Sequence, residues 1–233
     1  MFYYYGAKNI LCRYYDPPLH SLIIEPFAGS ASYSCYHLKR NPNLQALLYE
    51  KDDKVVSLWR YLLSASEQDI LHHPKPDIGE HTTDFFIITC AASNASAKSS
   101  KMVFSDRIDR VFEIQKRKVL NLLSLRDRIQ VIHGDYQRAS NETATWFIDP
   151  PYQIHTKSHN NQNGDGYSAK CGASQIDYTS LSEWCKERQG QVIVCEKEGA
   201  DWLPFRPFKM AKTSQNKRYA EVVWGNNEDG LFE

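Results

Sequence analysis

The sequence lacks any uninterrupted apolar stretch that approaches the roughly 20 residues needed by a membrane-spanning helix. Its N-terminus also lacks the basic region and apolar core of a secretion signal. We therefore expect a globular protein of the cytoplasm that makes no contact with a membrane.

Paired cysteines are absent as well. The six cysteines are scattered without the spacing of a disulfide framework or a zinc site, so free thiols are expected. No cysteine accompanies His72, His73 and His81 as it would in a zinc site, which favours surface histidines over metal ligands. The sequence therefore predicts no metal.

The chain also lacks net charge, since 28 basic residues balance 28 acidic residues. A protein that binds a polyanion without the help of a partner usually carries a net positive charge. Any binding to nucleic acid must therefore depend on a local basic patch.

The 233 residues, 42% of them hydrophobic, suffice for one catalytic domain with a modest insert but not for two full domains. Short apolar runs at 22–24, 46–49, 130–133 and 146–148 are typical of buried strands, and two more runs lie at 191–195 and 218–224. The first four runs lead into acids, namely Glu25, Glu50, Asp135 and Asp149. In a parallel sheet these carboxylates would crowd one edge, which is costly unless a ligand with hydrogen-bond donors, or a cation, lies there.

The strongest chemical signal is Asp149-Pro150-Pro151-Tyr152, which follows the run 146–148. Proline has no backbone N–H, so the carbonyls here are expected to stay free to accept beside the Asp149 carboxylate. Two acceptors could grip the amino group of a planar ring and localise its nitrogen lone pair, while Tyr152 stacks on the ring. An ordinary turn is the alternative. Asp16-Pro17-Pro18 repeats the tripeptide without a clean strand before it or a ring after it, and a turn is predicted there.

Residues 22–32 are predicted to form a strand, a turn of small residues and the start of a helix. Small residues let a ligand approach the backbone beyond the carboxyl end of a strand. Gly29 is the only glycine here, so the dinucleotide fingerprint is absent and a tight connection is the alternative. Glu50 follows about 20 residues later, where an acid accepts from ribose hydroxyls in nucleotide-binding folds. Otherwise Glu50 is a neighbour of a helix N-cap beside Asp52 and Asp53.

Taken in order, these motifs resemble the Dam-like (alpha-class) DNA adenine-N6 methyltransferases. The matching set covers most of the chain outside 61–118 and consists of Tyr4-Tyr5-Gly6-Ala7-Lys8, Glu25-Pro26-Phe27-Ala28-Gly29, Glu50, Gly134-Asp135 and Asp149-Pro150-Pro151-Tyr152. The resemblance implies an α/β, Rossmann-like S-adenosylmethionine-dependent methyltransferase fold, with a seven-stranded, mostly parallel sheet and a small helical insert. It implies a methyl group moved from S-adenosyl-L-methionine to the N6 amine of an adenine flipped out of double-stranded DNA. A bacterial, phage or mobile-element context would follow.

The resemblance also implies roles for individual residues. Cofactor binding would involve Tyr4, Lys8, Pro26, Phe27, Gly29, Glu50, Asp135 and Asp149, and catalysis would involve Asp149, Pro150, Pro151 and Tyr152. Lys8 would meet the cofactor carboxylate, Glu50 the ribose hydroxyls and Asp135 the cofactor adenine. The sequence departs from the family pattern at Tyr4, where tryptophan is usual, at Ala31, where a second glycine is usual, and at Glu50, where aspartate is commoner.

The catalytic domain is predicted at 1–60 and 119–233, and 61–118 is predicted to be a small helical target-recognition insert. Basic residues cluster between 98 and 128, where apolar residues recur at helical spacing, so one helix face packs and the other carries charge. That face is either solvated or turned toward phosphates. The polar segment 91–100 suits a flexible loop that could order on DNA. The segment 153–174, with Tyr167, His155 and Lys157, is either a lid over an extruded base or a disordered surface loop.

Two other functions stay open. The acceptor could be RNA adenine or cytosine N4, although aspartate rather than serine at position 149 favours adenine. The chain could also be a non-catalytic nucleic-acid-binding subunit. Its neutral charge and short insert are consistent with a protein partner that supplies sequence recognition.

Overall fold

The computed structural model describes residues 2, 4, 8–92, 95–96, 99–153, 171–212 and 218–226, with the backbone alone at 211, 212, 218 and 219. Tyr5, Gly6 and Ala7 of the lysine motif lie outside the described residues. So does most of the predicted lid, including His155, Lys157 and Tyr167.

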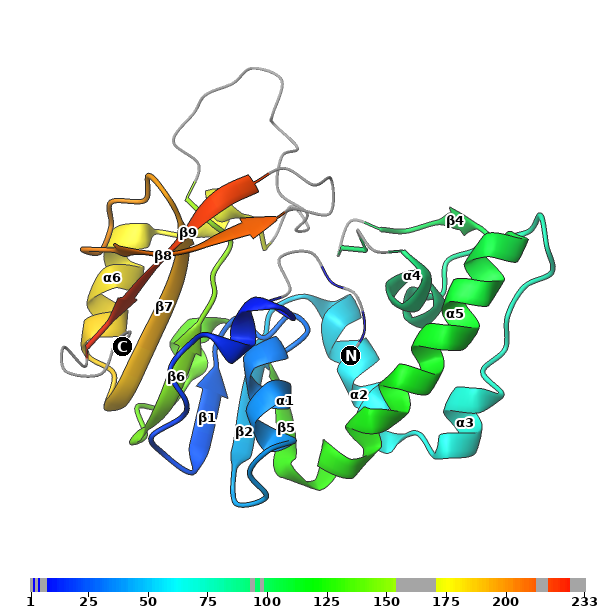
Figure 1. The fold of residues 1–233 in the computed structure, drawn as a ribbon, viewed down its shortest axis with the longest axis horizontal. Helices are drawn as coiled ribbons and strands as arrows, with labels where there is room; N and C mark the ends of the chain where they lie inside the picture. Colours follow the sequence, from blue (N-terminus) through cyan, green and yellow to red (C-terminus); the bar gives the residue numbers. More distant parts are fainter. Residues whose placement is uncertain are drawn as a thin grey trace.

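Seven strands form one sheet in the order β5-β2-β1-β6-β7-β9-β8 (Figure 1). Their bounds are β1 (Leu22–Glu25), β2 (Gln45–Glu50), β5 (Ile129–His133), β6 (Ala144–Ile148), β7 (Gly190–Lys197), β8 (Arg206–Lys212) and β9 (Arg218–Gly225). Neighbours from β5 to β7 are parallel, and β9 runs antiparallel between β7 and β8. The predicted fold class is confirmed: this is the seven-stranded, mostly parallel sheet of the Rossmann-like methyltransferase fold. The sequence did not reveal β8, because its charged residues and proline interrupt any apolar run.

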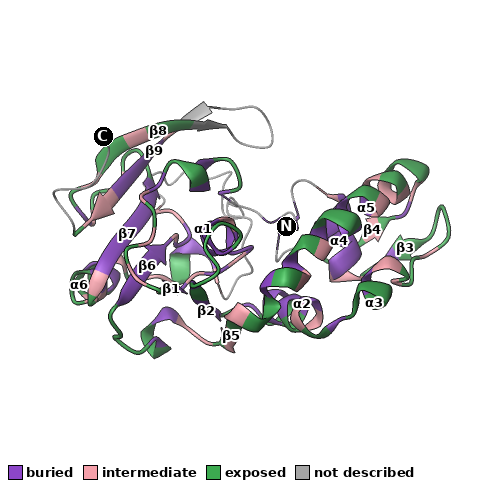
Figure 2. Cartoon of the chain, turned by 60° about the horizontal axis from the view of Figure 1, so that its bottom comes forward, coloured by how far each residue is buried: buried purple, intermediate pink, exposed green. Residues whose placement is uncertain are grey.

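Each face of the sheet has its own apolar core, because side chains alternate along a strand. On β1, Ile23 belongs to one core and Ile24 to the other, and Phe147 and Trp146 divide in the same way on β6. The first face is covered by α1 (Ser32–Leu38), α2 (Asp53–Ser64) and the 3-10 helix η2 (Leu120–Arg128), and the second by α6 (Tyr178–Lys186). Figure 2 shows β6 and β7 as buried strands between these layers. Ligands must therefore approach at the strand ends.

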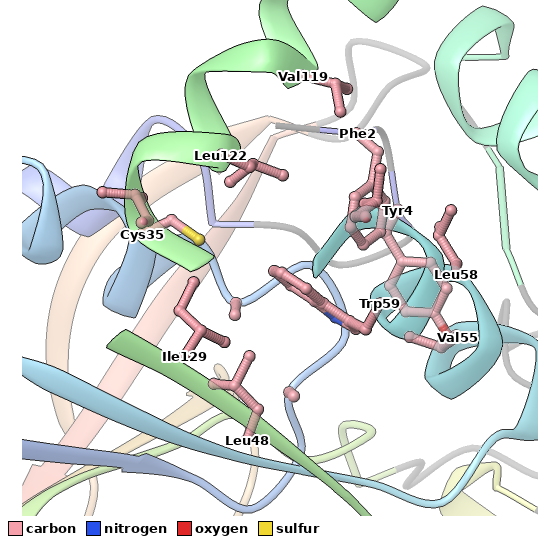
Figure 3. Close-up of a cluster of buried hydrophobic side chains, with 14 of the residues drawn as sticks. Phe2, Tyr4, Cys35, Leu48, Val55, Leu58, Trp59, Val119, Leu122 and Ile129 are labelled. Carbon is pink, nitrogen blue, oxygen red and sulfur yellow. The ribbon is translucent and has the colours of Figure 1, made fainter. Parts of the chain in front are cut away.

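Trp59 on α2 joins the larger core to the turn after β1. Its ring meets Phe2 edge-on with centroids 5.5 Å apart, and Figure 3 shows Leu48 and Ile129 of the sheet beside it. Its indole N–H donates to the carbonyl oxygen of Gly29 at 2.8 Å. A buried tryptophan that satisfies its one polar atom in this way fixes the position of its partner. The predicted cofactor turn is thus anchored in the core.

The region predicted as the insert forms the right-hand part of Figure 1. It contains α3 (Glu67–Leu71), α4 (Phe85–Ala91), most of α5 (Asp106–Val119) and an antiparallel pair, β3 (His81–Thr82) and β4 (Met102–Val103). Phe86 and Phe112 from this region pack in the same apolar cluster as Trp59. The proposed boundaries at 61 and 118 stay a prediction.

Four of the described basic residues between 98 and 128 have partners inside the chain, and one of them, Arg110, donates to the carbonyl of Asp106 within its own helix at 3.3 Å. The Lys116 ammonium donates to the carbonyl of Leu71 at 2.7 Å, and the guanidinium of Arg128 donates to that of Asn41 at 3.0 Å. Arg126 donates to the carbonyl of Ala65 at 3.4 Å. These cations bind helix ends and connecting chain within the fold, so less of the cluster is free for phosphate than its charge suggests. Among the described residues, every helix is too short or too polar to cross a bilayer.

Candidate functional site

A cavity opens where β1, β2, β5 and β6 end. Strand order reverses between β1 and β6, and ligands of open α/β sheets bind in the crevice beyond the strand ends at such a switch point. The cavity therefore occupies the place where this fold holds a ligand.

All eight residues that the resemblance assigns to the cofactor line this one cavity: Tyr4, Lys8, Pro26, Phe27, Gly29, Glu50, Asp135 and Asp149. Of the four assigned to catalysis, Asp149 and Pro151 line it, whereas Pro150 and Tyr152 do not. Glu50 and Asp149, which are 99 residues apart in sequence (149 minus 50), thus face the same space. The individual roles stay predictions.

Gly29 needs to be glycine at the turn after β1. Its φ is +49°, a left-handed conformation, and a Cβ would lie 3.1 Å from Cδ1 of Tyr4. Its amide donates to Oε2 of Glu50 at 2.9 Å. The aromatic ring predicted to replace the family tryptophan therefore packs directly on the turn.

Glu50 serves the local backbone as well as the cavity. Its Oε1 accepts from the amides of Lys51 and Asp52, both at 2.9 Å, and Asp52 caps the N-terminus of α2. A carboxylate has about four lone-pair sites, so three backbone donors leave acceptor capacity on Oε2. The two sequence interpretations of Glu50 are compatible.

Ala31, where the family usually has glycine, is the one described non-glycine residue with positive φ, at 46°. We expect Ala31→Gly to change the free energy of unfolding by less than about 1 kcal/mol. Relief of about 1–2 kcal/mol of left-handed strain is offset by about 0.8 kcal/mol for the lost buried methyl and by glycine entropy. The change in the free energy of unfolding is measured by urea denaturation. Ala31→Val, whose branched side chain resists this conformation, should cost clearly more, and equal stability of the two variants would contradict the strained turn.

The Lys8 ammonium lies between the carboxylates of Asp149 and Glu221. It is 2.9 Å from Oδ1 of Asp149 and 3.6 Å from Oε1 of Glu221 on β9. It also lies 4.8 Å from the centroid of the Tyr152 ring. Lys8 was expected to meet a cofactor carboxylate, and here it pairs with carboxylates of the chain itself.

Glu221 is a site residue that the sequence did not reveal. Its side chain is fully buried, and its Oε1 accepts from the hydroxyls of Tyr152 at 2.6 Å and Tyr15 at 3.0 Å. The available signal was an acid inside the apolar run 218–224, two residues from Val223 and therefore on the same face of the strand.

Two expectations for the tetrapeptide need correction or restriction. The prediction that the carbonyls stay free is wrong at Pro151, whose oxygen accepts from the Tyr178 hydroxyl. The Tyr152 ring is held from the side by its bond to Glu221 and is only partly buried, so stacking on a base stays a prediction. The other copy, Asp16-Pro17-Pro18, lies in irregular chain before β1, does not line the cavity, and shows no turn.

Burial dominates the electrostatics of the acids. It raises the pKa of Asp149 to about 6, with the Lys8 charge lowering and the Glu221 charge raising it. An acid whose pKa lies near neutral pH can both hold and accept protons at a reacting amine. Burial likewise raises the pKa of Glu25 to about 8.

Glu25 should make the fold less stable as pH rises. Because its pKa is 4.5 in the unfolded chain and about 8 in the fold, the folded state keeps a proton that the unfolded state loses across this window. Glu25→Gln removes the ionisation and keeps an oxygen for the Ser34 amide, which donates to Glu25 at 2.7 Å. We expect the variant to gain stability over wild type at pH 8 relative to pH 5, as measured by urea denaturation. Parallel pH curves for the two proteins would contradict the burial argument.

Asp135, which also lines the cavity, pairs with the Lys51 ammonium at 2.8 Å. Phe27 stacks on Tyr136, with ring centroids 5.3 Å apart. An acid next to two stacked rings suits a flat, amino-bearing ring.

Asp149, Cys195 and Glu221 are the group of described residues whose ligand atoms lie close enough, within 4.8 Å, to hold a metal ion. The Lys8 ammonium already lies against both carboxylates, and burial raises the pKa of the Cys195 thiol well above its usual range. The group is better described as an ion-paired network. All six cysteines are free thiols.

No family model matches the chain, and no curated protein matches it. Among solved structures, the Escherichia coli protein yhhF, assigned as a methyltransferase by inference, aligns with a TM-score of 0.35 and 11% identity over 87% of this chain and 74% of its own. HI0767 from Haemophilus influenzae, assigned as a methylase by inference, gives 0.38 and 14% over 94% and 85%. The mitomycin 7-O-methyltransferase MmcR gives 0.39 and 10% over 91% and 51%. These values are low, so the fold assignment depends on the strand order of the sheet itself.

Proposed function

We propose that the chain is an S-adenosylmethionine-dependent methyltransferase that acts on the N6 amine of adenine in DNA. One observation carries the proposal: Asp149, at the start of the tetrapeptide after β6, opens onto the same cavity as the Gly29 turn and Glu50. A cofactor site and an acceptor for an amine thus share one space at the switch point of the sheet.

The residues present fit this cofactor. Glu50 offers acceptor capacity at the turn, Phe27 and Tyr136 offer an apolar ring pair, and Asp135 offers a carboxylate beside them. The Asp149 carboxylate supplies negative charge in the cavity, which suits a sulfonium cation. When bound, S-adenosylmethionine supplies an electrophilic methyl group.

Asp149 would be the residue that acts directly on the adenine amine. Its carboxylate accepts a hydrogen bond from the adenine amine and so turns the nitrogen lone pair toward the methyl group. As the new nitrogen–carbon bond forms, the amine must lose a proton, and Asp149 is placed to take it. The Lys8 ammonium keeps Asp149 ionised before that step, since it lowers the pKa of this carboxyl.

The test is incubation of the purified chain with labelled S-adenosylmethionine and, separately, double-stranded DNA and RNA, followed by mass spectrometry of the nucleosides. We expect N6-methyladenine in DNA. Methylcytosine, or methyladenine confined to RNA, would move the acceptor to one of the two rivals. Calorimetry with S-adenosylmethionine checks the cofactor, and a folded chain without binding would overturn the enzyme assignment.

A protein partner that supplies DNA recognition is a second element of this proposal. The neutral chain uses Lys116, Arg126 and Arg128 within its own fold, which lowers the charge left for phosphates. Weak methylation by the chain alone, with only shallow dependence on salt, would agree with this need.

A further inference from the structure

Glu221 occupies a buried position, where an ionised carboxylate costs free energy because it loses its water. It lies on β9, whose register pairs it with Lys197 of β7 and Lys209 of β8, and its side chain is 0% exposed. Its Oε2 is buried and has no hydrogen-bond partner among the described residues. A buried charge persists only where its partners compensate for lost water. The other oxygen should therefore show what the residue does.

Oε1 of Glu221 gathers three groups at once. The Tyr152 hydroxyl donates to it at 2.6 Å, the Tyr15 hydroxyl donates at 3.0 Å, and the Lys8 ammonium lies 3.6 Å away. Tyr152 belongs to the tetrapeptide, and Lys8 pairs with Asp149 at 2.9 Å. Two of the three groups are thus immediate neighbours of Asp149.

We propose that Glu221 is a positioning residue of the candidate site, which holds the Lys8 ammonium and the Tyr152 ring in place beside Asp149. The inference rests on the proposed function for its catalytic consequence, but the arrangement can be tested without it. Lys8 comes from the N-terminal segment and Tyr152 from the loop after β6, so neither is fixed by a helix or strand of its own. Glu221 lies within a strand and gives both a rigid anchor.

The arrangement also sets how much of the Lys8 charge Asp149 receives. Lys8 is shared between two carboxylates, and the nearby Glu221 charge opposes ionisation of Asp149. The other groups that act electrostatically on this corner are Tyr15 before β1, Glu25 on β1, Tyr152, and Cys195 and Glu196 on β7. A neutral residue at 221 removes this opposing charge while Lys8 still pairs with Asp149, whose carboxyl should then ionise at lower pH.

The first test needs neither cofactor nor DNA. Carboxyl-labelled aspartate is titrated by NMR in wild type, Glu221→Gln and the control Tyr15→Phe, with Asp149→Asn to assign the signal. We expect Glu221→Gln to move the Asp149 midpoint to lower pH, whereas Tyr15→Phe, which removes only a hydroxyl bound to Glu221, leaves it near wild type. The same midpoint in wild type and Glu221→Gln would overturn the proposal.

The second test uses activity. Glu221→Ala is expected to lower kcat by roughly 10²-fold, the loss that accompanies a displacement of about 1 Å at a reacting centre. Tyr152→Phe breaks the same contact from the other side, so its effect and that of Glu221→Gln should be less than additive in the double variant. Strict additivity would count against a shared contact. If the wild-type protein is inactive but Glu221→Gln still moves the Asp149 midpoint, the proposed function is overturned and the positioning role stands.

Discussion

Replacement of Asp149 by alanine is expected to lower the rate of methyl transfer by about 10³-fold or more. The carboxylate is the acceptor that would orient the adenine amine, and loss of one preorganised group at a reacting atom costs about 10²–10³-fold in kcat. Removal of the proton acceptor adds to this loss. The rate is measured as label transferred from S-adenosylmethionine to DNA under single-turnover conditions.

The chain offers a matched control for this prediction. Asp16 stands in the other Asp-Pro-Pro tripeptide but does not line the cavity, so Asp16→Ala should keep the wild-type rate. Lys8 retains Glu221 as a partner when Asp149 is lost, and we therefore expect Asp149→Ala to fold. Full activity of a folded Asp149→Ala protein with bound cofactor would remove Asp149 from the mechanism.

Gly190→Ala should cause the largest loss of stability among single substitutions of the sheet. Gly190 begins β7 with φ of +96°, and an added Cβ would lie 2.2 Å from the carbonyl oxygen of Ala144 on β6. Backbone cannot yield as a flexible side chain does, so strain of about 1–3 kcal/mol is joined by a clash, and we expect a total above about 3 kcal/mol. For a chain of this size that lowers Tm by roughly 10 °C, measured by calorimetry.

Gly79→Ala separates the two causes of that loss. Gly79 also has positive φ, +94°, but an added Cβ would meet nothing within 4 Å. It should show the strain without the clash and lose about 1–3 kcal/mol. Similar losses of stability for both variants would mean that β7 can move away from β6. β6, which leads into the tetrapeptide, would then be less rigidly placed.

Most of the cavity could be predicted from local sequence. Short apolar runs that end in Glu25, Glu50, Asp135 and Asp149 predicted parallel strands with acids at one edge, and the four strands pair in parallel as expected. Because parallel strands share one carboxyl edge, sequence order was enough to bring Glu50 and Asp149 to one space.

The sequence could not predict the contacts of the tetrapeptide in the same way. Proline chemistry correctly predicts a missing donor, but the carbonyl of Pro151 is taken by Tyr178 from a later helix. Lys8 has a motif but no partner in its local sequence, and its neighbours come from the loop after β6 and from β9. The basic residues near α5 similarly predicted charge but not its use within the fold.

By itself the sequence determined the type of sheet, the acids at its edge and the small-residue turn, because strand periodicity, proline and glycine act within a few residues. Only the tertiary structure decided that Glu221 is buried beside Lys8 and Tyr152 and that Asp149 shares its cation with a second acid. Those relations depend on the pairing of β9 with β7, and strand pairing across a long separation in sequence is fixed by packing of the whole sheet.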